Sequence, residues 1–403
     1  MQIMMKYGYI FILLSAFILS CEQEMSSEQA DSFIKFYGSY LMDEAGDVEV
    51  LGNGGYAICG TETSESQGKR MVLIVTDEFG NVESGFPRYY MQDGLETGGS
   101  SLIALQNGSG GFVLSGYVER PVAGSSGVQK DIFVVRTTAA GDTSWQRSYG
   151  SVEDEQVLHS VEGIRSGYLL AGYQLKNGKS DIMVMGVTEE GDSVRLSLNY
   201  NNPYAVNSAA TYLLNAGNMY LCTCTYDKIN GEGTGIQVLT FNDDLSPLAK
   251  NLSGEYNEYG MCILEEGVGQ FLVLGNREGA SGGSEILLYG IETQGLLITN
   301  STLNATISEV NSDLIGERMA QTTSGGLAIT GTRRADNNDE ILLQFVSSSY
   351  QTEMPVSFGA SGAQTGKDIE LAGDGGFVVL GTNSDGGSST ISLLKTNSSG
   401  DIE

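Results

Sequence analysis

Short apolar runs recur along the chain, and most of them follow a glycine. They are too short for helices, and glycine or polar residues bound them on both sides, so we expect strands that are covered on both faces. The opening run of each copy begins 50 to 56 residues after the previous one, and seven copies are present: Tyr56-Ala57-Ile58, Phe112-Val113-Leu114, Tyr168-Leu169-Leu170, Tyr220-Leu221-Cys222, Phe271-Leu272-Val273, Leu327-Ala328-Ile329 and Phe377-Val378-Val379.

Each copy has room for four strands. In the second copy we expect them at residues 101–105, 112–116, 131–137 and 143–149. Glycine-rich turns separate the first strand from the second and the third from the fourth, which suits hairpins that need positive φ. Four-stranded repeats of this length, stacked radially, predict a β-propeller.

The two ends of the repeat array complete each other. Residues 32–38 (SFIKFYG) are similar to residues 144–150 (SWQRSYG), which form the end of a repeat, while the last copy stops at Glu403 before its own final strand. We therefore expect an all-β, seven-bladed β-propeller over residues 32–403, made of four-stranded antiparallel blades and closed by the N-terminal strand in the last blade.

The repeat pattern is Gly-Gly-(Tyr/Phe)-apolar-Gly, then Asp-Ile-apolar, then Gly-Asp and Trp-x-x-x-Tyr-Gly. It resembles the repeats of a family of bacterial secreted and surface β-propellers, and it lacks the Trp-Asp signature of WD40 blades. The resemblance implies the architecture and names no ligand, because propellers support many functions.

Residues 1–20 have the features of a cleavable signal peptide: Lys6 is followed by an apolar run shorter than a membrane span. The segment that ends the run, Ile18-Leu19-Ser20-Cys21, resembles the lipobox of bacterial lipoproteins. The resemblance implies lipidation of Cys21 and a membrane partner held through the acyl chains. The alternative is an ordinary signal peptide with a chance cysteine at the cleavage site.

Residues 21–31 are polar and acidic, so we expect a flexible tether. An acidic cluster after the lipidated cysteine resembles a surface-export signal, which favours the outer membrane with the domain facing the cell surface. The periplasmic face is the alternative. The chain carries 50 acidic and 21 basic side chains, for a formal charge of −29. This charge repels phosphate backbones, so we expect no nucleic acid partner.

A binding site is expected where connections vary in length. The connections after the second and fourth strands differ between copies, as at residues 117–130 and 302–316, and they lie on one face around the central channel. Candidate ligand-binding residues on that face or in the channel are Asp43, Asp154, His159, Tyr204, Tyr256, Arg333 and Arg334. The alternative for each loop residue is a solvated or turn-capping side chain, and for His159 a buried or channel-lining one.

We assign no catalytic residue, metal site or cofactor from the sequence. His159 is the single histidine, and the match to G-x-S-x-G at residues 279–283 falls in a glycine-rich loop without a strand-to-helix turn. Calcium is the weaker alternative, because residues 242–244, 336–340 and 383–386 offer oxygen ligands without the spacing of a defined calcium loop. Cys59, Cys222, Cys224 and Cys262 are expected to be reduced core residues.

Two function classes follow. The first is a non-enzymatic cell-envelope lipoprotein that binds a partner protein or glycan, or acts as a scaffold, through the face with the variable connections. The alternative is a glycan-active lyase or hydrolase that uses carboxylates and tyrosines of that face. The sequence favours the first, because histidine is nearly absent and no carboxylate pair stands out.

Overall fold

The described part of the chain consists of β-strands. The computed structural model describes residues 32–105, 110–122, 124, 127–191, 194–200, 205–229, 231, 233–252, 257–279, 283–335 and 338–402. These ranges contain 28 strands and no helix, and so no helix that could cross a bilayer. The predicted all-β class is confirmed.

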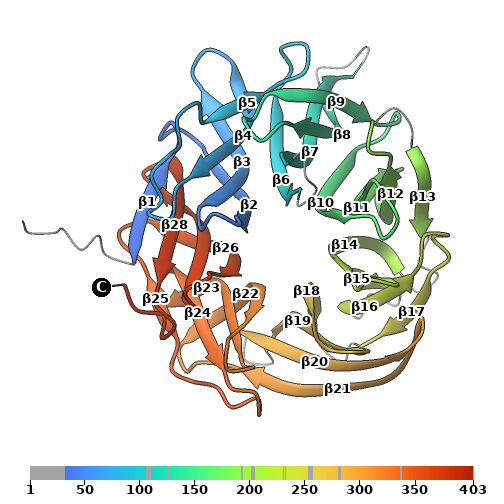
Figure 1. Ribbon diagram of the computed structural model, residues 1–403. Helices are drawn as coiled ribbons and strands as arrows, with labels where there is room; N and C mark the ends of the chain where they lie inside the picture. The colour runs from blue at the N-terminus through green and yellow to red at the C-terminus, as the bar shows by residue number, and fades with distance from the viewer. Residues whose placement is uncertain are drawn as a thin grey trace, which may run out of the picture. The chain divides into compact units, whose positions relative to one another are not determined.

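The strands fall into sets of four. Six sets follow the chain from the centre of the assembly outwards, and in the seventh β26, β27 and β28 do so while β1 is the outermost strand (Figure 1). The first strands are β2 (Glu44–Val50), β6 (Thr97–Ala104), β10 (Glu155–Glu162), β14 (Ala205–Asn215), β18 (Glu258–Gly267), β22 (Ser312–Gln321) and β26 (Ala363–Leu371). The second strands are β3 (Tyr56–Ser64), β7 (Phe112–Pro121), β11 (Tyr168–Lys176), β15 (Tyr220–Lys228), β19 (Gln270–Glu278), β23 (Leu327–Ala335) and β27 (Phe377–Asp385).

The third and fourth strands form the outer half of each set. The third strands are β4 (Gly68–Thr76), β8 (Val128–Thr137), β12 (Lys179–Val187), β16 (Thr234–Phe241), β20 (Ser284–Gln294), β24 (Asn338–Val346) and β28 (Ser388–Thr396). The outermost strands are β5 (Arg88–Tyr90), β9 (Thr143–Tyr149), β13 (Val194–Tyr200), β17 (Leu248–Asn251), β21 (Leu297–Ile307), β25 (Val356–Phe358) and β1 (Phe33–Tyr37).

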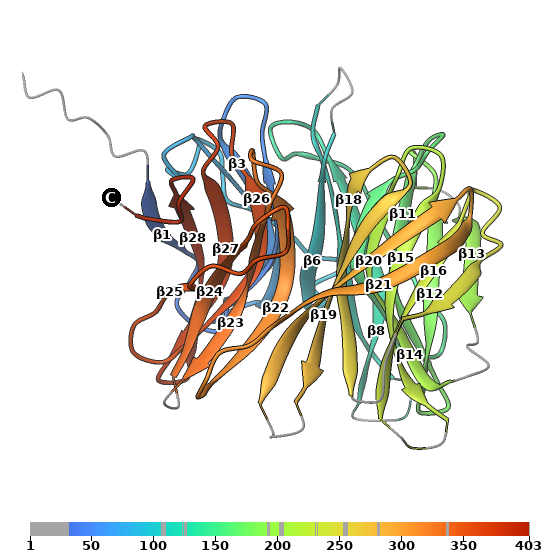
Figure 2. The same cartoon turned by 90° about the horizontal axis from the view of Figure 1, so that it is seen from below.

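Five of these sets are separate four-stranded antiparallel sheets. The remaining two share one eight-stranded sheet, because a single parallel pair, Asp339 with Ala363, joins β24 to β26. Each first strand contacts the first strand of the next set, and β26 contacts β2. Figure 2 shows the same sheets from the side, with their strands running between two faces.

The N-terminal strand completes the last set, as the sequence predicts. Strand β1 pairs antiparallel with β28 over five residue pairs, from Phe33 with Lys395 to Tyr37 with Ile391. The Tyr37 ring is buried, and its hydroxyl donates to the Gly80 carbonyl at 2.7 Å. Tyr37 thereby ties the start of the chain both to its end and to the turn after β4.

Apolar side chains of neighbouring sets pack between the sheets. Leu73 of β4, Leu114 of β7 and Phe133 of β8 belong to one such cluster and are fully buried. Burying a side chain of this size stabilises the fold by about 1.5–3 kcal/mol. Because both faces of each central strand are covered in this way, the strands appear in the sequence as unbroken apolar runs.

Strand ends differ from the prediction. The stretches 117–130 and 302–316, expected to be loops, are mostly paired strand: β7 runs to Pro121, β8 begins at Val128, β21 runs to Ile307 and β22 begins at Ser312. Polar side chains at these ends led to the wrong boundary, because the hairpins extend past the apolar core while their backbones stay paired.

Candidate active site at the channel mouth

A β-bulge occurs at the same place in each of the seven first strands. One residue of the first strand has no partner on the second strand: Gly46, Ser100, Leu158, Thr211, Met261, Glu317 and Lys367. A bulge turns the side chains of the extra residue and its successor to the same side of the strand. The sequence repeat therefore directs two side chains per set toward the centre.

The residue opposite each bulge explains the recurring glycine of the second strand. Gly172 pairs with Val157, the last residue before the bulge, and a Cβ on Gly172 would lie 1.9 Å from the Gln156 carbonyl oxygen. A side chain at this position would collide with the bulged backbone. The fourth set has Cys224 there instead, opposite Ala210, and it keeps both the bulge and its four strands.

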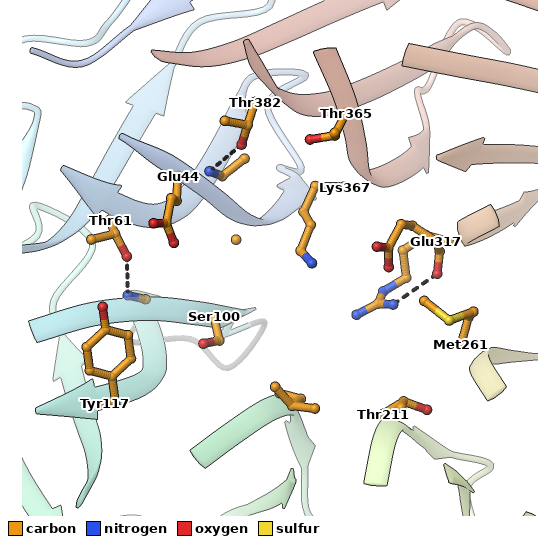
Figure 3. A pocket seen from close by; sticks show the side chains of 15 residues that line it. Glu44, Thr61, Ser100, Tyr117, Thr211, Met261, Glu317, Thr365, Lys367 and Thr382 are labelled. Atoms are coloured by element: carbon orange, nitrogen blue, oxygen red, sulfur yellow. Dashed lines mark hydrogen bonds between the residues drawn. The ribbon is translucent and has the colours of Figure 1, made fainter. Parts of the chain in front are cut away.

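All seven bulged residues line one hollow of about 560 Å³. The other lining residues come from the beginnings of first strands and the far halves of second strands, among them Glu44, Thr61, Tyr117, Thr365 and Thr382. We call this hollow the channel mouth and the face that it opens on the mouth face. Figure 3 shows side chains from several sets pointing into it, including Glu44, Tyr117 and Lys367.

Glu44 and Tyr117 form one side of the channel mouth. The Glu44 carboxylate is more than half exposed and lies 3.4 Å from the Lys69 ammonium. Burial, followed by the negative charge of Glu44, raises the pKa of the Tyr117 hydroxyl above its ordinary value. The phenol therefore keeps its proton at neutral pH and can act as a hydrogen-bond donor to a ligand oxygen.

Two cations lie on the other side of the channel mouth. Among the described residues, neither Arg318 nor Lys367 forms a salt bridge. The Arg318 guanidinium donates a hydrogen bond from Nη1 to the carbonyl of its neighbour Glu317 at 3.0 Å. By contrast, Arg333 elsewhere on the protein is held by the carboxylates of Glu309 and Glu340.

The residues that follow the bulges form a second layer beneath the channel mouth. We call this layer the channel ring: Asp47, Ser101, His159, Tyr212, Cys262, Arg318 and Asp368. His159 stacks on Tyr212 with 3.8 Å between ring centroids, and the Arg318 guanidinium lies 4.8 Å from the centroid of the same tyrosine. Tyr212 of β14 thus contacts His159 of the preceding set and Arg318 of β22, two sets further along the chain.

His159 is a neutral member of the channel ring. Its Nδ1 accepts a hydrogen bond from the Leu213 amide at 3.4 Å. Burial, followed by the positive charge of Arg318, holds the pKa of His159 well below its ordinary value. The imidazole is therefore uncharged at neutral pH, with its proton on Nε2.

Asp47 and Asp368 form a carboxyl pair across the contact between β2 and β26. Asp47 accepts hydrogen bonds from the Ser101 hydroxyl and the Leu102 amide, while Asp368 accepts from the Val48 amide. Burial, followed by the charge of Asp368, raises the pKa of Asp47 well above its ordinary value. Asp47 therefore keeps its proton to a higher pH than an exposed aspartate does.

Two more acids lie one alternation further along the same strands, Glu49 on β2 and Glu370 on β26. Burial, followed by the charge of Asp368, raises the pKa of Glu49 to about 7 and also raises the pKa of Glu370. These central carboxyls therefore stay protonated to a higher pH than the same side chains would in water.

Most of the described candidate residues from the sequence are bound within the fold. Asp43 is fully buried and accepts from the amides of Ser39, Tyr40 and Thr63. Asp154 accepts from the Lys130 amide at 2.8 Å.

Among the other candidates, Arg334 pairs with Asp339 and borders a separate hollow with Glu309. Arg333 is held by two carboxylates, and His159 belongs to the channel ring. Tyr204, Tyr256 and the lipidation candidate Cys21 lie outside the described residues. None of the described candidates lines the channel mouth.

The described residues contain no group of three or more His, Cys, Asp or Glu side chains placed to hold a metal. Residues 336–337 of the calcium candidate and residues 280–282 of the G-x-S-x-G match lie outside the described part of the chain. Cys59, Cys222, Cys224 and Cys262 are buried and free.

The sequence analysis missed Glu44, Lys367 and Arg318 and treated Tyr117 only as the start of a loop. A signal for two of them is present: in Gly316-Glu317-Arg318 and Gly366-Lys367-Asp368 both residues after the glycine are charged, which is so in none of the other five repeats. That these charged residues face the channel follows only from the bulge, and the bulge cannot be inferred from the residue pattern.

Comparison with known proteins supports the fold. No family model matches the chain, and no curated protein is found to be similar to it. A polysaccharide lyase, ulvan lyase bound to -[GlcA(1-4)Rha3S]-, has a TM-score of 0.57 at 12% identity, over 90% of this chain and 96% of that chain. The structure of that lyase family without the sugar gives a TM-score of 0.56 over the same shares.

A puromycin-hydrolysing peptidase of Mycobacterium tuberculosis has a TM-score of 0.55 at 12% identity and covers 90% of this chain. The chain spans about half the length of that peptidase, 52%. At this identity the likenesses show the fold alone.

These comparisons correct the expected function. The sequence favoured a non-enzymatic binding or scaffolding protein, but the two ulvan lyase structures, matched over 96% of their own length, are polysaccharide lyases. The low histidine content led to the wrong preference, since acid–base chemistry on a sugar can also use tyrosine and carboxylate groups.

Proposed function

We propose that the chain is a glycan-active enzyme, a lyase or hydrolase, that cleaves a polysaccharide at the channel mouth of a closed seven-bladed β-propeller. The succession of contacts between first strands, which returns from β26 to β2, supports the closed ring. The pairing of β1 with β28 supports its closure within the last blade. Loops and strand ends on a rigid scaffold of this kind are where active sites form.

The observation that carries the proposal is the meeting of a proton donor and a carboxylate in one hollow. Tyr117 from β7 and Glu44 from β2 both line the channel mouth. Cleavage of a glycosidic bond needs a group that protonates the leaving oxygen and a group that accepts a proton from the sugar or from water. The protonated phenol of Tyr117 suits the first role and the Glu44 carboxylate the second.

The channel mouth has the size and openness that a chain-like substrate requires. Its volume of about 560 Å³ holds a few sugar units, within the range of small-molecule sites. Half-buried hydroxyls of Ser100 and Thr365 on its wall are suited to bonding with sugar hydroxyls.

The test is turnover on a panel of neutral and acidic polysaccharides, measured as new reducing ends. We expect at least one member to be cleaved, and Tyr117→Phe and Glu44→Gln each to lower kcat at least about a hundredfold, as expected for loss of a general acid or base. The control is Tyr350→Phe, which removes a hydroxyl bound to Glu266 on the opposite face. If no panel member is cleaved, or if Tyr117→Phe behaves like Tyr350→Phe, the proposal is wrong.

The cellular setting is a further part of the proposal. We propose that Cys21 is lipidated and that residues 21–31 tether the propeller to the outer membrane, facing the cell surface. The lipobox-like segment before Cys21 and the acidic residues after it support this placement. A polysaccharide-cleaving enzyme in this position would meet polymers that are too large to enter the cell.

A further inference from the structure

Two cations of the channel mouth, Arg318 and Lys367, form no salt bridge with a described residue, although Glu44 and Glu317 line the same mouth. The formal charge of the chain is −29, so an unpaired cation is unexpected on charge balance alone. Nevertheless, Arg318 and Lys367 line the mouth without a salt bridge to any described carboxylate. A guanidinium and an ammonium kept free in a shared hollow fit an anionic ligand.

Asp368 and Glu317 lie near enough for their charges to act on Arg318, but neither forms a salt bridge with it. The Asp368 carboxylate accepts from the Val48 amide at 3.0 Å and from the Ile369 amide at 2.9 Å. It also pairs with Asp47, so its oxygens are used within the channel ring. Arg318 therefore keeps donors for a group that enters from the mouth.

The stacked side chains of Tyr212 and His159 orient the Arg318 guanidinium. Arg318 lies over the Tyr212 ring, which in turn is stacked on His159, and the His159 imidazole is tied to the Leu213 amide. A guanidinium packed on an aromatic face loses less freedom when it binds a planar anion, so the stack prepares the site for a ligand.

We propose that the substrate is an acidic polysaccharide whose carboxylate or sulfate is bound by Arg318 and Lys367, with Tyr212 and His159 as positioning residues beneath Arg318. This inference rests on the proposed function and specifies the substrate class. Both anions present oxygens in the geometry that a guanidinium binds, and the sugar hydroxyls would meet the hydroxyl-rich wall.

His159 offers a built-in reporter, because it is the only histidine of the chain. The full chain with isotope-labelled histidine is titrated with three probes of equal length: an oligogalacturonate, a sulfated galactan oligosaccharide and a neutral malto-oligosaccharide. We expect one or both acidic probes to shift the His159 ring signals saturably, since an anion on Arg318 changes the field at the stacked imidazole. The neutral probe leaves them in place, and the responding probe identifies carboxylate or sulfate.

Charge-removing variants test the two cations. We expect Arg318→Gln and Lys367→Gln each to weaken binding of the acidic probe at least about tenfold. The control Lys250→Gln, which removes one positive charge from the outermost strand β17, leaves binding unchanged. If Arg318→Gln unfolds, Lys367→Gln decides. Unshifted His159 signals with every acidic probe, equal binding of the neutral probe, or normal binding by Lys367→Gln would overturn the inference.

The positioning role of Tyr212 has its own readout on the cleaved substrate. Tyr212→Leu removes the stack and raises KM at least about fivefold while kcat changes little, and Tyr212→Phe restores the KM. An unchanged KM in Tyr212→Leu would contradict this role.

The two proposals can fail separately. If acidic probes bind through Arg318 but no glycan is cleaved, the proposed function fails and the inference stands. If neutral glycans are cleaved and Arg318→Gln keeps full activity, the inference fails and the proposed function stands.

Discussion

Replacement of Glu49 by glutamine should stabilise the protein at neutral and alkaline pH and have little effect in acid. The pKa of Glu49 rises from an ordinary 4.5 to about 7, because the carboxyl is buried beside Asp368 and Glu162. Each pKa unit corresponds to about 1.4 kcal/mol, and water reaching the half-buried carboxyl lowers the effect, so ionised Glu49 costs the fold about 2–3 kcal/mol.

The sign and the pH window follow from proton linkage. Below pH 4.5 Glu49 is protonated in both states, so its burial adds no ionisation cost. Between pH 4.5 and about 7 the folded state keeps a proton that the unfolded chain has released, and stability falls as the pH rises. Above pH 7 the whole cost is present. Glutamine is neutral throughout, so the advantage of Glu49→Gln should grow across this window.

The assay is thermal unfolding of Glu49→Gln and the parent chain in steps from pH 4 to pH 8. For a unit of this size we expect the difference in Tm to rise from near zero to about 3–4 °C. The matched control is Glu265→Gln, whose carboxyl is exposed on β18, and its difference should stay flat. A flat curve for Glu49→Gln, or an equal rise for the control, would refute the account of the channel acids.

Three further predictions concern the closure, the bulge and the anchor. Tyr37→Ala should destabilise the fold by about 3–4 kcal/mol in denaturant unfolding, whereas Phe36→Ala on the exposed side of the same strand should cost under about 1 kcal/mol; equal losses would count against β1 as a closing strand. Gly172→Ala should lower the free energy of unfolding by more than about 2 kcal/mol, because the new Cβ would collide with the Gln156 carbonyl. The control Gly373→Ala, with no atom within 4 Å of its Cβ, should lower it by about 0.5 kcal/mol or less, and a tolerated Gly172→Ala would disprove the steric argument. Cys21→Ala should release the protein from membranes and abolish fatty-acid labelling, and a mutant that is still labelled would exclude Cys21 as the anchor.

The sequence predicted the strands because apolar burial recurs with the repeat. Phe112, Val113 and Leu114 are buried on both faces of β7, and this produces the unbroken run that marks a covered strand. The pairing of Phe33 with Lys395 could also be predicted, since a missing final strand and an orphan similar segment stand at opposite ends of the chain. Strand ends such as Pro121 and Ser312 could not be predicted, because backbone pairing beyond the core needs no apolar side chains.

The candidate site was harder to predict, because a residue's position in a connection does not show whether its side chain is already bound within the fold. Asp43 and Arg333 were candidates because of the connections near which they lie, and in the structure they stabilise those connections. Asp43 accepts hydrogen bonds from three backbone amides, and Arg333 pairs with two carboxylates. A charged residue in a short turn is commonly bound by the turn, so exposure in the sequence pattern does not make it available to a ligand. Arg318 is available for the opposite reason, since a strand presents it where its nearest acid is already engaged.

The bulge connects the repeat to its chemistry. The glycine of the second strand leaves space for a bulged backbone, and the bulge turns two residues of the first strand toward the channel; only the glycine is part of the repeat pattern. The bulged position itself holds glycine, serine, leucine, threonine, methionine, glutamate or lysine in the seven sets, so it tolerates any side chain that reaches into the mouth. The fold therefore constrains the glycine and leaves the bulged residue free to vary. In a protein built this way, the residues that select a substrate are those where the repeat is least regular, and Lys367 and Arg318 are the two cations that line this mouth.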